Sequence, residues 1–254
     1  MKVSIITVVF NGADTIKQAI ESVLSQKYTD IEYVIIDGAS KDETIEIIRS
    51  YGNRIAKFIS EPDKGLYDAM NKGLALASGD VIGILNADDF YADADVISDV
   101  VASFAAKPAD SLYADLLYVD KDNPEKVIRY WKSGQLKTRS QFAYGWMPPH
   151  PTFFVKRDIY VKFGVFDTHF TSAADYELML RLLYKHHISV NYLPRVTTMM
   201  RVGGKSNQNI HNRIHANNED KQAWVKNGLP LRFYTMWLKP IRKVPQFFKK
   251  YKQK

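Results

Sequence analysis

Residues 3 to 37 read VSIITVVFNGADTIKQAIESVLSQKYTDIEYVIID, and this stretch predicts the fold class. Its first seven residues are mostly β-branched and apolar on both alternations, which is typical of a strand buried on both faces of a parallel sheet. Apolar residues then recur at helical spacing from Ile16 to Leu24, and residues 32 to 36 return to an apolar run. A strand, an amphipathic helix and a second strand in this order indicate a right-handed βαβ unit.

The alternation of strand and helix continues through the first half of the chain. After Asp42, a helix-capping candidate, the pattern predicts a helix to Tyr51, a strand at 55–59, a helix at 66–74 and a strand at 81–85. We therefore expect an α/β fold with a Rossmann-like, doubly wound sheet.

The second half of the chain has a different pattern. Two strands, at 111–119 and 126–131, are expected around a polar turn. A third short strand at 151–155 precedes two helices, at 156–163 and 175–184. The sheet is therefore expected to be mixed. The Gly- and Asn-rich stretch at 201–210 predicts a mobile loop.

Composition limits the class of protein and places the charge. The 254 residues include no cysteine, so neither a disulfide nor a cysteine nucleophile is available. The N-terminus is interpreted as a strand rather than a signal peptide, and no apolar stretch is long enough to span a membrane. The net charge of +7 arises in residues 229–254, which hold eight basic residues and no acid, so residues 1–228 carry 7 − 8 = −1.

The basic segment 229–254, here called the tail, is also rich in aromatic residues. We expect a C-terminal helical, basic extension that lies on an anionic membrane surface, which would place the protein in the cytoplasm and on the inner face of the membrane. Two alternatives remain open, because such a segment can also pack on the body of the protein or bind nucleic acid.

Polar side chains follow four predicted strands at the points where the strands end. These residues are Phe10 and Asn11, then Asp37, then Glu61, Asp63 and Lys64, then Asn86, Asp88 and Asp89. Ligands of open α/β sheets bind beyond the carboxyl ends of the strands, so this set predicts a binding site. Single members have structural alternatives, since Asp37 can form a turn and the Asp88–Asp89 pair can cap a helix.

The residues after the first strand exclude two nucleotide-binding classes. FNGADT has one glycine where a dinucleotide-binding protein has GxGxxG, and the chain contains no Walker A sequence. The acidic pair after the fourth strand suits a divalent cation held by oxygen ligands and shared with a diphosphate. We expect Asp89 to face solvent there, with a nucleoside diphosphate as the partner.

The segments SIITVVFN, IEYVIIDGASKDET and SEPDKGLYDAMNKGLALASGDVIGILNADDF resemble the nucleotide-binding half of glycosyltransferase family 2, the inverting transferases of GT-A fold. A weaker resemblance extends over 150–182. The resemblance implies that residues 1–91 bind the nucleotide sugar and that 92–228 bind the acceptor and catalyse transfer, while the tail, 229–254, lies beyond it.

The resemblance also implies roles for single residues. Val8, Phe10, Asn11, Asp37 and Lys64 would surround a uracil-type base and its ribose. The Asn86–Asp89 element would bind the nucleotide sugar through Asn86 and Asp88, with Asp88 on the ribose, and Asp89 would hold Mn²⁺ or Mg²⁺. Asp175 would be the general base, with Glu177 and Asp167 as weaker candidates.

This chain departs from the family pattern at three places. The usual DDGS is here Asp37-Gly38-Ala39-Ser40, so the second carboxylate is missing, and Ala174 precedes Asp175 where the family has glutamate. Asn86 stands where a third acid is common. These departures predict modest metal affinity.

Several further residues have two interpretations each. His211 and His215 share a helix spacing, which indicates a polar surface more often than a metal site. His150 either walls an acceptor pocket or packs. Arg201, Lys205 and Ser206 either form a lid over the diphosphate or lie in a solvated loop.

The sequence therefore predicts a metal-dependent inverting glycosyltransferase that uses a nucleotide sugar, with UDP as the expected nucleotide and a lipid-linked saccharide of cell-surface polysaccharide assembly as the expected acceptor. A nucleotidyltransferase acting on sugar phosphates is the alternative enzyme, and a nucleic-acid-binding module is the alternative without catalysis. The donor sugar, the acceptor linkage and the oligomeric state are not encoded in any motif here.

Overall fold

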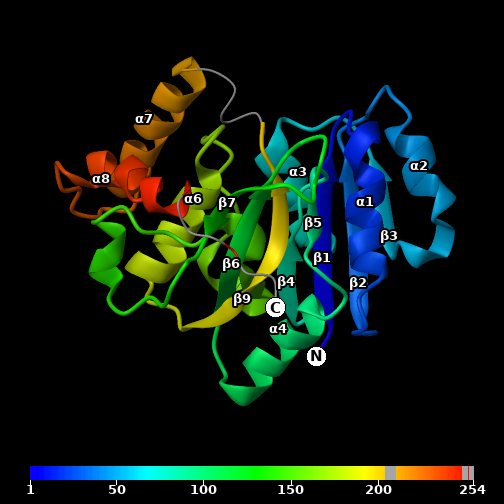
Figure 1. Ribbon diagram of the computed structural model, residues 1–254, viewed down its shortest axis with the longest axis horizontal. Coiled ribbons are helices and arrows are strands. Elements are labelled where there is room, and N and C mark those ends of the chain that lie inside the picture. The colour runs from blue at the N-terminus through cyan, green and yellow to red at the C-terminus, as the bar shows by residue number, and fades with distance from the viewer. Residues whose placement is uncertain (204–209, 248–250, 252–254) are drawn as a thin grey trace.

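The four N-terminal strands form the parallel part of a nine-stranded sheet (Figure 1). The computed structural model describes residues 1–203, 210–247 and 251. Within them the strand order is β3-β2-β1-β4-β8-β6-β9-β5, with β7 paired to β6. The parallel strands are β1 (Val3–Val9), β2 (Ile31–Asp37), β3 (Lys57–Ser60) and β4 (Val81–Ile84). Because β1 lies between β2 and β4, the strand order reverses there, and the carboxyl ends of these strands meet at one edge.

Helices cover both faces of the sheet, which confirms the doubly wound prediction. One apolar cluster joins α1 (Ala13–Leu24), α2 (Thr44–Ser50) and α4 (Val96–Ala106) to one face. The other face packs on α3 (Leu66–Leu76), α5 (Arg157–Phe163) and α6 (Ala174–Met179), which continues as a π-helical turn over Leu180–Lys185. Alternate side chains of β1 enter the two clusters, so both of its faces are buried.

The second half adds mixed strands to the sheet. They are β5 (Asp89–Tyr91), β6 (Ser111–Val119), β7 (Val127–Trp131), β8 (Phe154–Lys156) and β9 (Val190–Arg201). β6 and β7 form the expected antiparallel pair, and β8 joins β4 to β6. Three short 3₁₀ turns lie at Gly52–Arg54, Arg139–Phe142 and His150–Thr152.

Three local predictions for the second half are wrong. The strand expected at 151–155 begins only at Phe154, because the proline-flanked residues before it form a 3₁₀ turn. The strand β9 was not anticipated, and its pairing with β6 is irregular where Pro194 interrupts the ladder. Arg201 ends this strand instead of starting a loop, while the rest of the expected loop, with Lys205 and Ser206, falls at 204–209, outside the described residues.

The tail packs on the body through part of its length. α7 (Ile210–Lys226) precedes it, and the tail forms α8 (Thr235–Ile241) and a 3₁₀ turn at Val244–Phe247. Thr235 donates a 2.7 Å hydrogen bond to the carbonyl of Ala143, and α8 approaches Gly145 so closely that an added Cβ would lie 2.5 Å from the amide nitrogen of Lys239. These contacts support the packing alternative for this part of the tail.

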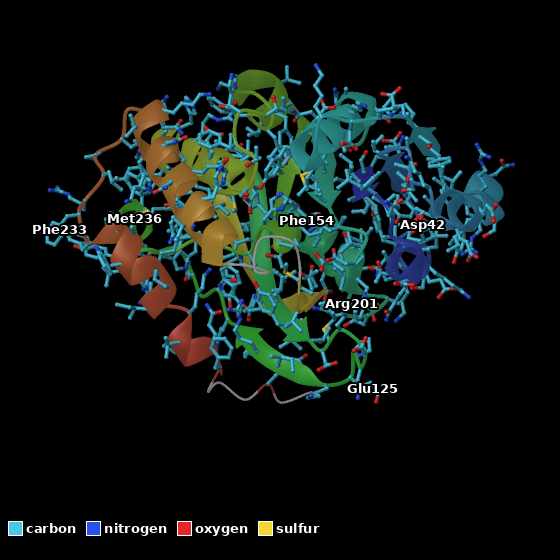
Figure 2. All side chains as sticks on the ribbon, turned by 90° about the horizontal axis from the view of Figure 1, so that it is seen from above. Asp42, Glu125, Phe154, Arg201, Phe233 and Met236 are labelled. Atoms are coloured by element: carbon cyan, nitrogen blue, oxygen red, sulfur yellow. The ribbon has the colours of Figure 1, made fainter. Side chains whose placement is uncertain are left out.

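Other tail side chains face outward. Phe233 and Trp237 are 89% and 75% exposed, and Phe233 lies at the outer rim of the protein (Figure 2). Across the described residues, no helix combines the length and apolar character that crossing a membrane requires.

Candidate active site

The loop after β1 forms the first wall of the site. Asn11 has a left-handed backbone (φ 49°), its amide donates to Ser40 Oγ at 2.7 Å, and its side-chain oxygen accepts from the Lys41 amide at 2.9 Å. Phe10 is 54% exposed and lies against Gly38, where an added Cβ would be 2.4 Å from Asp63. An exposed aromatic ring therefore lies beside a glycine, and Val8 of β1 is buried.

Asp37 holds the next loop together. Its carboxylate is fully buried and accepts hydrogen bonds from the Ser40 amide and hydroxyl and from Ser60 Oγ at 2.7 Å. The carboxylate already accepts these three internal hydrogen bonds, so the predicted contact with a base would be an additional one. Lys64 is exposed just before α3, where only its amide is engaged, with Asp68.

The acidic element after β4 contains oxygens without partners. Asp89 is fully buried, so the expectation that it faces solvent is wrong: it lies in β5, paired to Met200 of β9. Asn86 donates a 3.2 Å hydrogen bond to one Asp89 oxygen, and the other oxygen of Asp89 and Oδ1 of Asn86 have no partner among the residues that the structure describes. Burial, and then the neighbouring charge of Asp88, raise the pKa of Asp89 well above its usual range.

Arg201 lies beside this element and partly balances it. Its guanidinium donates to the Asp88 carbonyl at 2.6 Å and also contacts Gln18 and the ring of Phe90. Burial raises the pKa of Asp88, and the charge of Arg201 works in the opposite direction. Arg201 is fixed by these contacts at the end of β9, so of the three residues expected in a lid, this one belongs to the sheet.

The unpartnered oxygens fit a divalent cation. Mg²⁺ and Mn²⁺ prefer oxygen ligands, and Mg²⁺ is held by one or two carboxylates together with waters and substrate phosphates. Asp89 and Asn86 present such oxygens, with Asp88 adjacent. No group of three His, Cys, Asp or Glu side chains suited to a metal occurs in the described part of the chain, so the remaining ligands here would come from the diphosphate and water.

Asp175 is held by a tyrosine of α3. Its carboxylate accepts a 3.0 Å hydrogen bond from the hydroxyl of Tyr67, whose ring stacks on Phe166. His150 packs edge-on against the same Phe166, and burial lowers its pKa. The N-cap of α6 is Ala173, so Asp175 does not cap the helix, and its half-buried carboxylate has only Tyr67 as a side-chain partner among the described residues.

The competing acids are occupied elsewhere. Glu177 is 2% exposed and binds Arg181 and Asn227, while Asp167 binds His169 and Lys226. No sequence pattern pointed to Glu219 of α7. Its buried carboxylate accepts four hydrogen bonds, of 2.8 to 2.9 Å, from the loop at 171–173 that leads into Asp175.

The charges of the two acidic centres both act on one half-buried tyrosine. Tyr118 of β6 has its pKa raised by burial and further by the charges of Asp89 and Asp175, while Arg129, 3.7 Å above its ring, opposes them. Tyr118 is therefore near both carboxylates. His215 lies 3.7 Å from Glu219 rather than in a metal site, and the side chain of His211 lies outside the described part.

Residues 4–174 match the model of Glycosyl transferase family 2. The chain belongs to this family. It is 33% identical over 181 residues to an uncharacterized glycosyltransferase of Mycobacterium tuberculosis, covering 70% of this chain and 68% of that one. It is 26% identical over 209 residues to a PGL/p-HBAD biosynthesis glycosyltransferase of Mycobacterium bovis, covering 80% and 78%.

Solved structures show that the fold is of GT-A type. S. aureus TarS 1-349, in complex with UDP-GlcNAc, aligns with a TM-score of 0.70 and 16% identity over 89% of this chain and 65% of its own. Mannosyltransferase PcManGT from Pyrobaculum calidifontis, in complex with GDP-Man and Mn²⁺, aligns with a TM-score of 0.66 and 18% identity over 94% and 72%. The chain thus spans about two thirds of the TarS fragment.

Proposed function

We propose that this family member is a metal-dependent inverting transferase that moves a sugar from a UDP-sugar to a saccharide hydroxyl. The observation that carries the proposal is the pair of acidic centres whose charges both act on Tyr118. Asp89 has a buried oxygen at the strand ends with no partner among the described residues, and Asp175 is oriented by a hydrogen bond from Tyr67.

The strand-end wall suits the nucleotide. The exposed ring of Phe10 beside Gly38 offers a flat apolar face to a base, and Asn11 with Lys64 adds polar groups at its edge. Asp37 supports this wall by fixing residues 38–40. Asp88, next to Asp89, would reach the ribose.

Asp89, with Asn86 and Asp88, would hold the cation at the diphosphate. When bound, Mn²⁺ or Mg²⁺ supplies positive charge that neutralises the departing diphosphate. Arg201 already places a fixed guanidinium beside the same element, so this chain adds its own charge there.

Asp175 would take the proton of the acceptor hydroxyl. A carboxylate in this role must lie on the side opposite the leaving group, and we assign Asp175 to that position, since its charge and that of Asp89 both act on Tyr118. The hydrogen bond from Tyr67 leaves the second carboxylate oxygen of Asp175 available for that proton. Transfer then inverts the configuration at the sugar carbon, because attack and departure occur on opposite faces.

We further propose that the outward-facing aromatic residues of the tail attach the protein to anionic membranes, where a lipid-linked acceptor would lie. Phe233, Trp237 and Phe247 are all more than half exposed, and Arg232 adjoins them. Amphipathic aromatic rings with nearby basic residues favour the membrane interface.

Calorimetric titration and product analysis test the proposal together. UDP should bind more tightly with Mn²⁺ than with chelator and more tightly than GDP, and a panel of UDP-sugars should yield a donor that is consumed with inversion. Metal-independent binding, or formation of a nucleotide sugar from a sugar phosphate, would identify the alternative enzyme class.

A further inference from the structure

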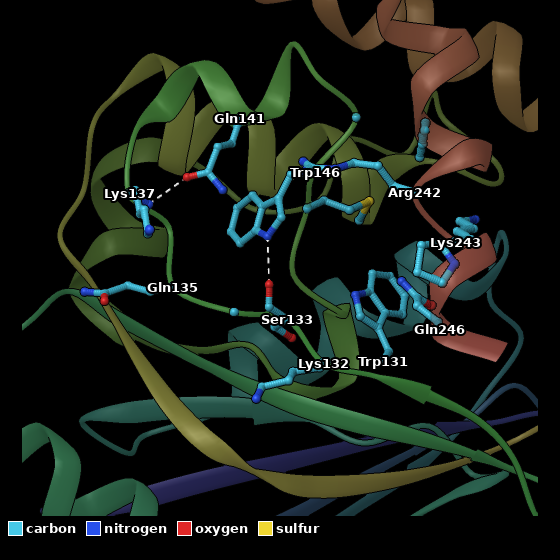
Figure 3. A pocket seen from close by; sticks show the side chains of 15 residues that line it. Trp131, Lys132, Ser133, Gln135, Lys137, Gln141, Trp146, Arg242, Lys243 and Gln246 are labelled. Atoms are coloured by element: carbon cyan, nitrogen blue, oxygen red, sulfur yellow. Dashed lines mark hydrogen bonds between the residues drawn. The ribbon is translucent and has the colours of Figure 1, made fainter. Parts of the chain in front are cut away.

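A cavity of about 580 Å³ lies between the body and the tail, apart from the strand-end wall (Figure 3). Its walls come from the segment after β7, from the loop at 141–147 and from the end of α8 with the 3₁₀ turn after it. This volume falls in the range of small-molecule sites, about 300–1,000 Å³.

All charged side chains that line the cavity are positive. Five lining residues are basic and none of the lining residues is acidic; the basic ones are Lys132, Lys137, Lys239, Arg242 and Lys243. Lys239 is paired to the buried Asp220 at 2.5 Å, which leaves four cations to attract a ligand. The side chain of Lys243 is reached by solvent but has protein around it. Its pKa is lowered to about 8, first by partial desolvation and then by repulsion from Lys239 and Arg129.

Aromatic and amide groups complete the lining. Trp146 forms one wall, where its indole nitrogen donates to the Ser133 carbonyl at 2.9 Å, and Trp131 lies opposite, beside Gln246 (Figure 3). Gln246 is only 8% exposed, and its side-chain oxygen has no hydrogen-bond partner among the described residues. An unpartnered buried oxygen is costly, and a hydroxyl donor from a ligand would satisfy it.

The cavity adjoins the catalytic side of the protein. The ammonium group of Lys239 lies 3.9 Å from the centre of the ring of Tyr176, the residue after Asp175. The charge of Asp175 also acts on Lys243. The cavity therefore lies beside α6, the helix that carries Asp175.

We propose that this cavity binds an anionic saccharide, and that the acceptor carries a carboxylate or phosphate group which Lys132, Arg242 and Lys243 recognise while an indole packs on a sugar ring. The assignment to the acceptor rests on the function proposed above. Phosphate and carboxylate share the chemistry these residues recognise, since both accept hydrogen bonds from ammonium and guanidinium groups. The hydroxyls of the saccharide distinguish it from a free anion.

A direct binding assay on the full chain tests this proposal without any transfer step. The labelled protein is applied to immobilised saccharides in matched sets of three, neutral, uronate-containing and phosphorylated, with a single-stranded oligonucleotide on the same surface. We expect at least one anionic member to bind about tenfold more protein than its neutral counterpart. The stronger of the two anionic arms identifies the source of the charge.

A charge-matched pair of variants makes the test specific. The variant K132Q/R242Q/K243Q removes three exposed cations of the cavity, and the control K121Q/K185Q/K221Q removes three exposed cations elsewhere, so both have the same net charge. Loss of three charge contacts should reduce saccharide binding about tenfold in the first and leave it unchanged in the second. Thermal melting of both variants should match that of the wild type.

Three results would overturn the proposal: equal binding of neutral and anionic members, equal loss in both variants, or capture of the oligonucleotide without any saccharide. Titration with UDP and Mn²⁺ is run on the same samples. Failure of UDP binding with retained anionic-saccharide binding refutes the proposed transferase alone, whereas UDP binding without any saccharide binding refutes the cavity assignment alone.

Discussion

Replacing Asp89 with asparagine should stabilise the metal-free protein and abolish its metal-dependent nucleotide binding. Asp89 is fully buried, one of its oxygens has no partner, and Asp88 adds a like charge beside it. D89N keeps the size of the side chain and the hydrogen bond with Asn86 but removes the charge. The same substitution should therefore stabilise the metal-free protein against unfolding and remove its metal-dependent nucleotide binding.

The structure sets the size of the expected stabilisation. An unsatisfied buried polar group costs about 1–3 kcal/mol, and more when charged. For a domain of this size, each kcal/mol shifts the melting temperature by about 2–4 °C, so D89N should melt about 2–12 °C higher in chelator. In the wild type, UDP with Mn²⁺ at a hundredfold excess over the dissociation constant should add about 2.7 kcal/mol, and this gain should vanish in D89N.

The pH dependence has a definite sign. Because the pKa of Asp89 is raised on folding, the folded protein binds that proton more tightly than the unfolded chain does. Stability of the metal-free wild type therefore falls as the pH rises from the ordinary carboxyl range through the raised pKa. The advantage of D89N over the wild type should grow over the same interval, which differential scanning fluorimetry in chelator measures.

Asp115 provides the matched control. It is 1% exposed, like Asp89, but its carboxylate accepts from Tyr130, Ser133 and Tyr192 at 2.7 to 2.9 Å. D115N should destabilise the protein and leave the gain from UDP and Mn²⁺ intact. If D89N melts below the wild type in chelator, or keeps the full gain from UDP and Mn²⁺, the assignment of Asp89 as an unbalanced metal ligand is wrong.

Three further changes address the other elements of the site. D175N should lower turnover about 10²- to 10⁴-fold with UDP affinity unchanged, and near-normal transfer would reassign the base. E219Q replaces one carboxylate oxygen with an NH₂ group that faces backbone N–H donors of the loop before Asp175. Turnover should therefore fall about tenfold while UDP affinity in a titration stays normal. An equal loss of UDP affinity would indicate general misfolding. F233S/W237S should lose binding to anionic vesicles in sedimentation without a change in melting temperature, and unchanged sedimentation would exclude these rings as the membrane contact.

The sequence predicted the parallel half of the sheet because three of its four strands are buried on both faces. β1, β2 and β4 are continuous apolar runs, and each ends where a turn begins. β9 escaped prediction because Pro194 and Arg195 interrupt its pattern, and it is stabilised by pairing with β6 rather than by its own residues. The prediction that Asp89 faces solvent was wrong for the same reason, since the burial of Asp89 depends on the pairing of β5 with β9.

Hydrogen bonds between residues distant in sequence could not be predicted from the motifs of the site. The motifs located Asp89 and Asp175, but not the contacts that define their environments, because those partners are distant in sequence. Tyr67 is 108 residues from Asp175, and Glu219 follows the loop it holds by 46 to 48 residues. Composition likewise identified the tail as basic without showing that Lys239 turns inward.

Two adjacent acids of α7 connect the tail to the loop before Asp175. Glu219 holds the backbone before Asp175, and Asp220, 4% exposed, holds Lys239 of α8. Burial raises the pKa of Asp220, and the charge of Lys239 opposes this, so removal of the tail would leave a buried carboxylate unpaired. Breaking such a pair costs about 3–5 kcal/mol. The part of the tail around Lys239 is therefore a wall of the folded protein, and the same helix that fixes Asp175 also fixes one side of the cationic cavity.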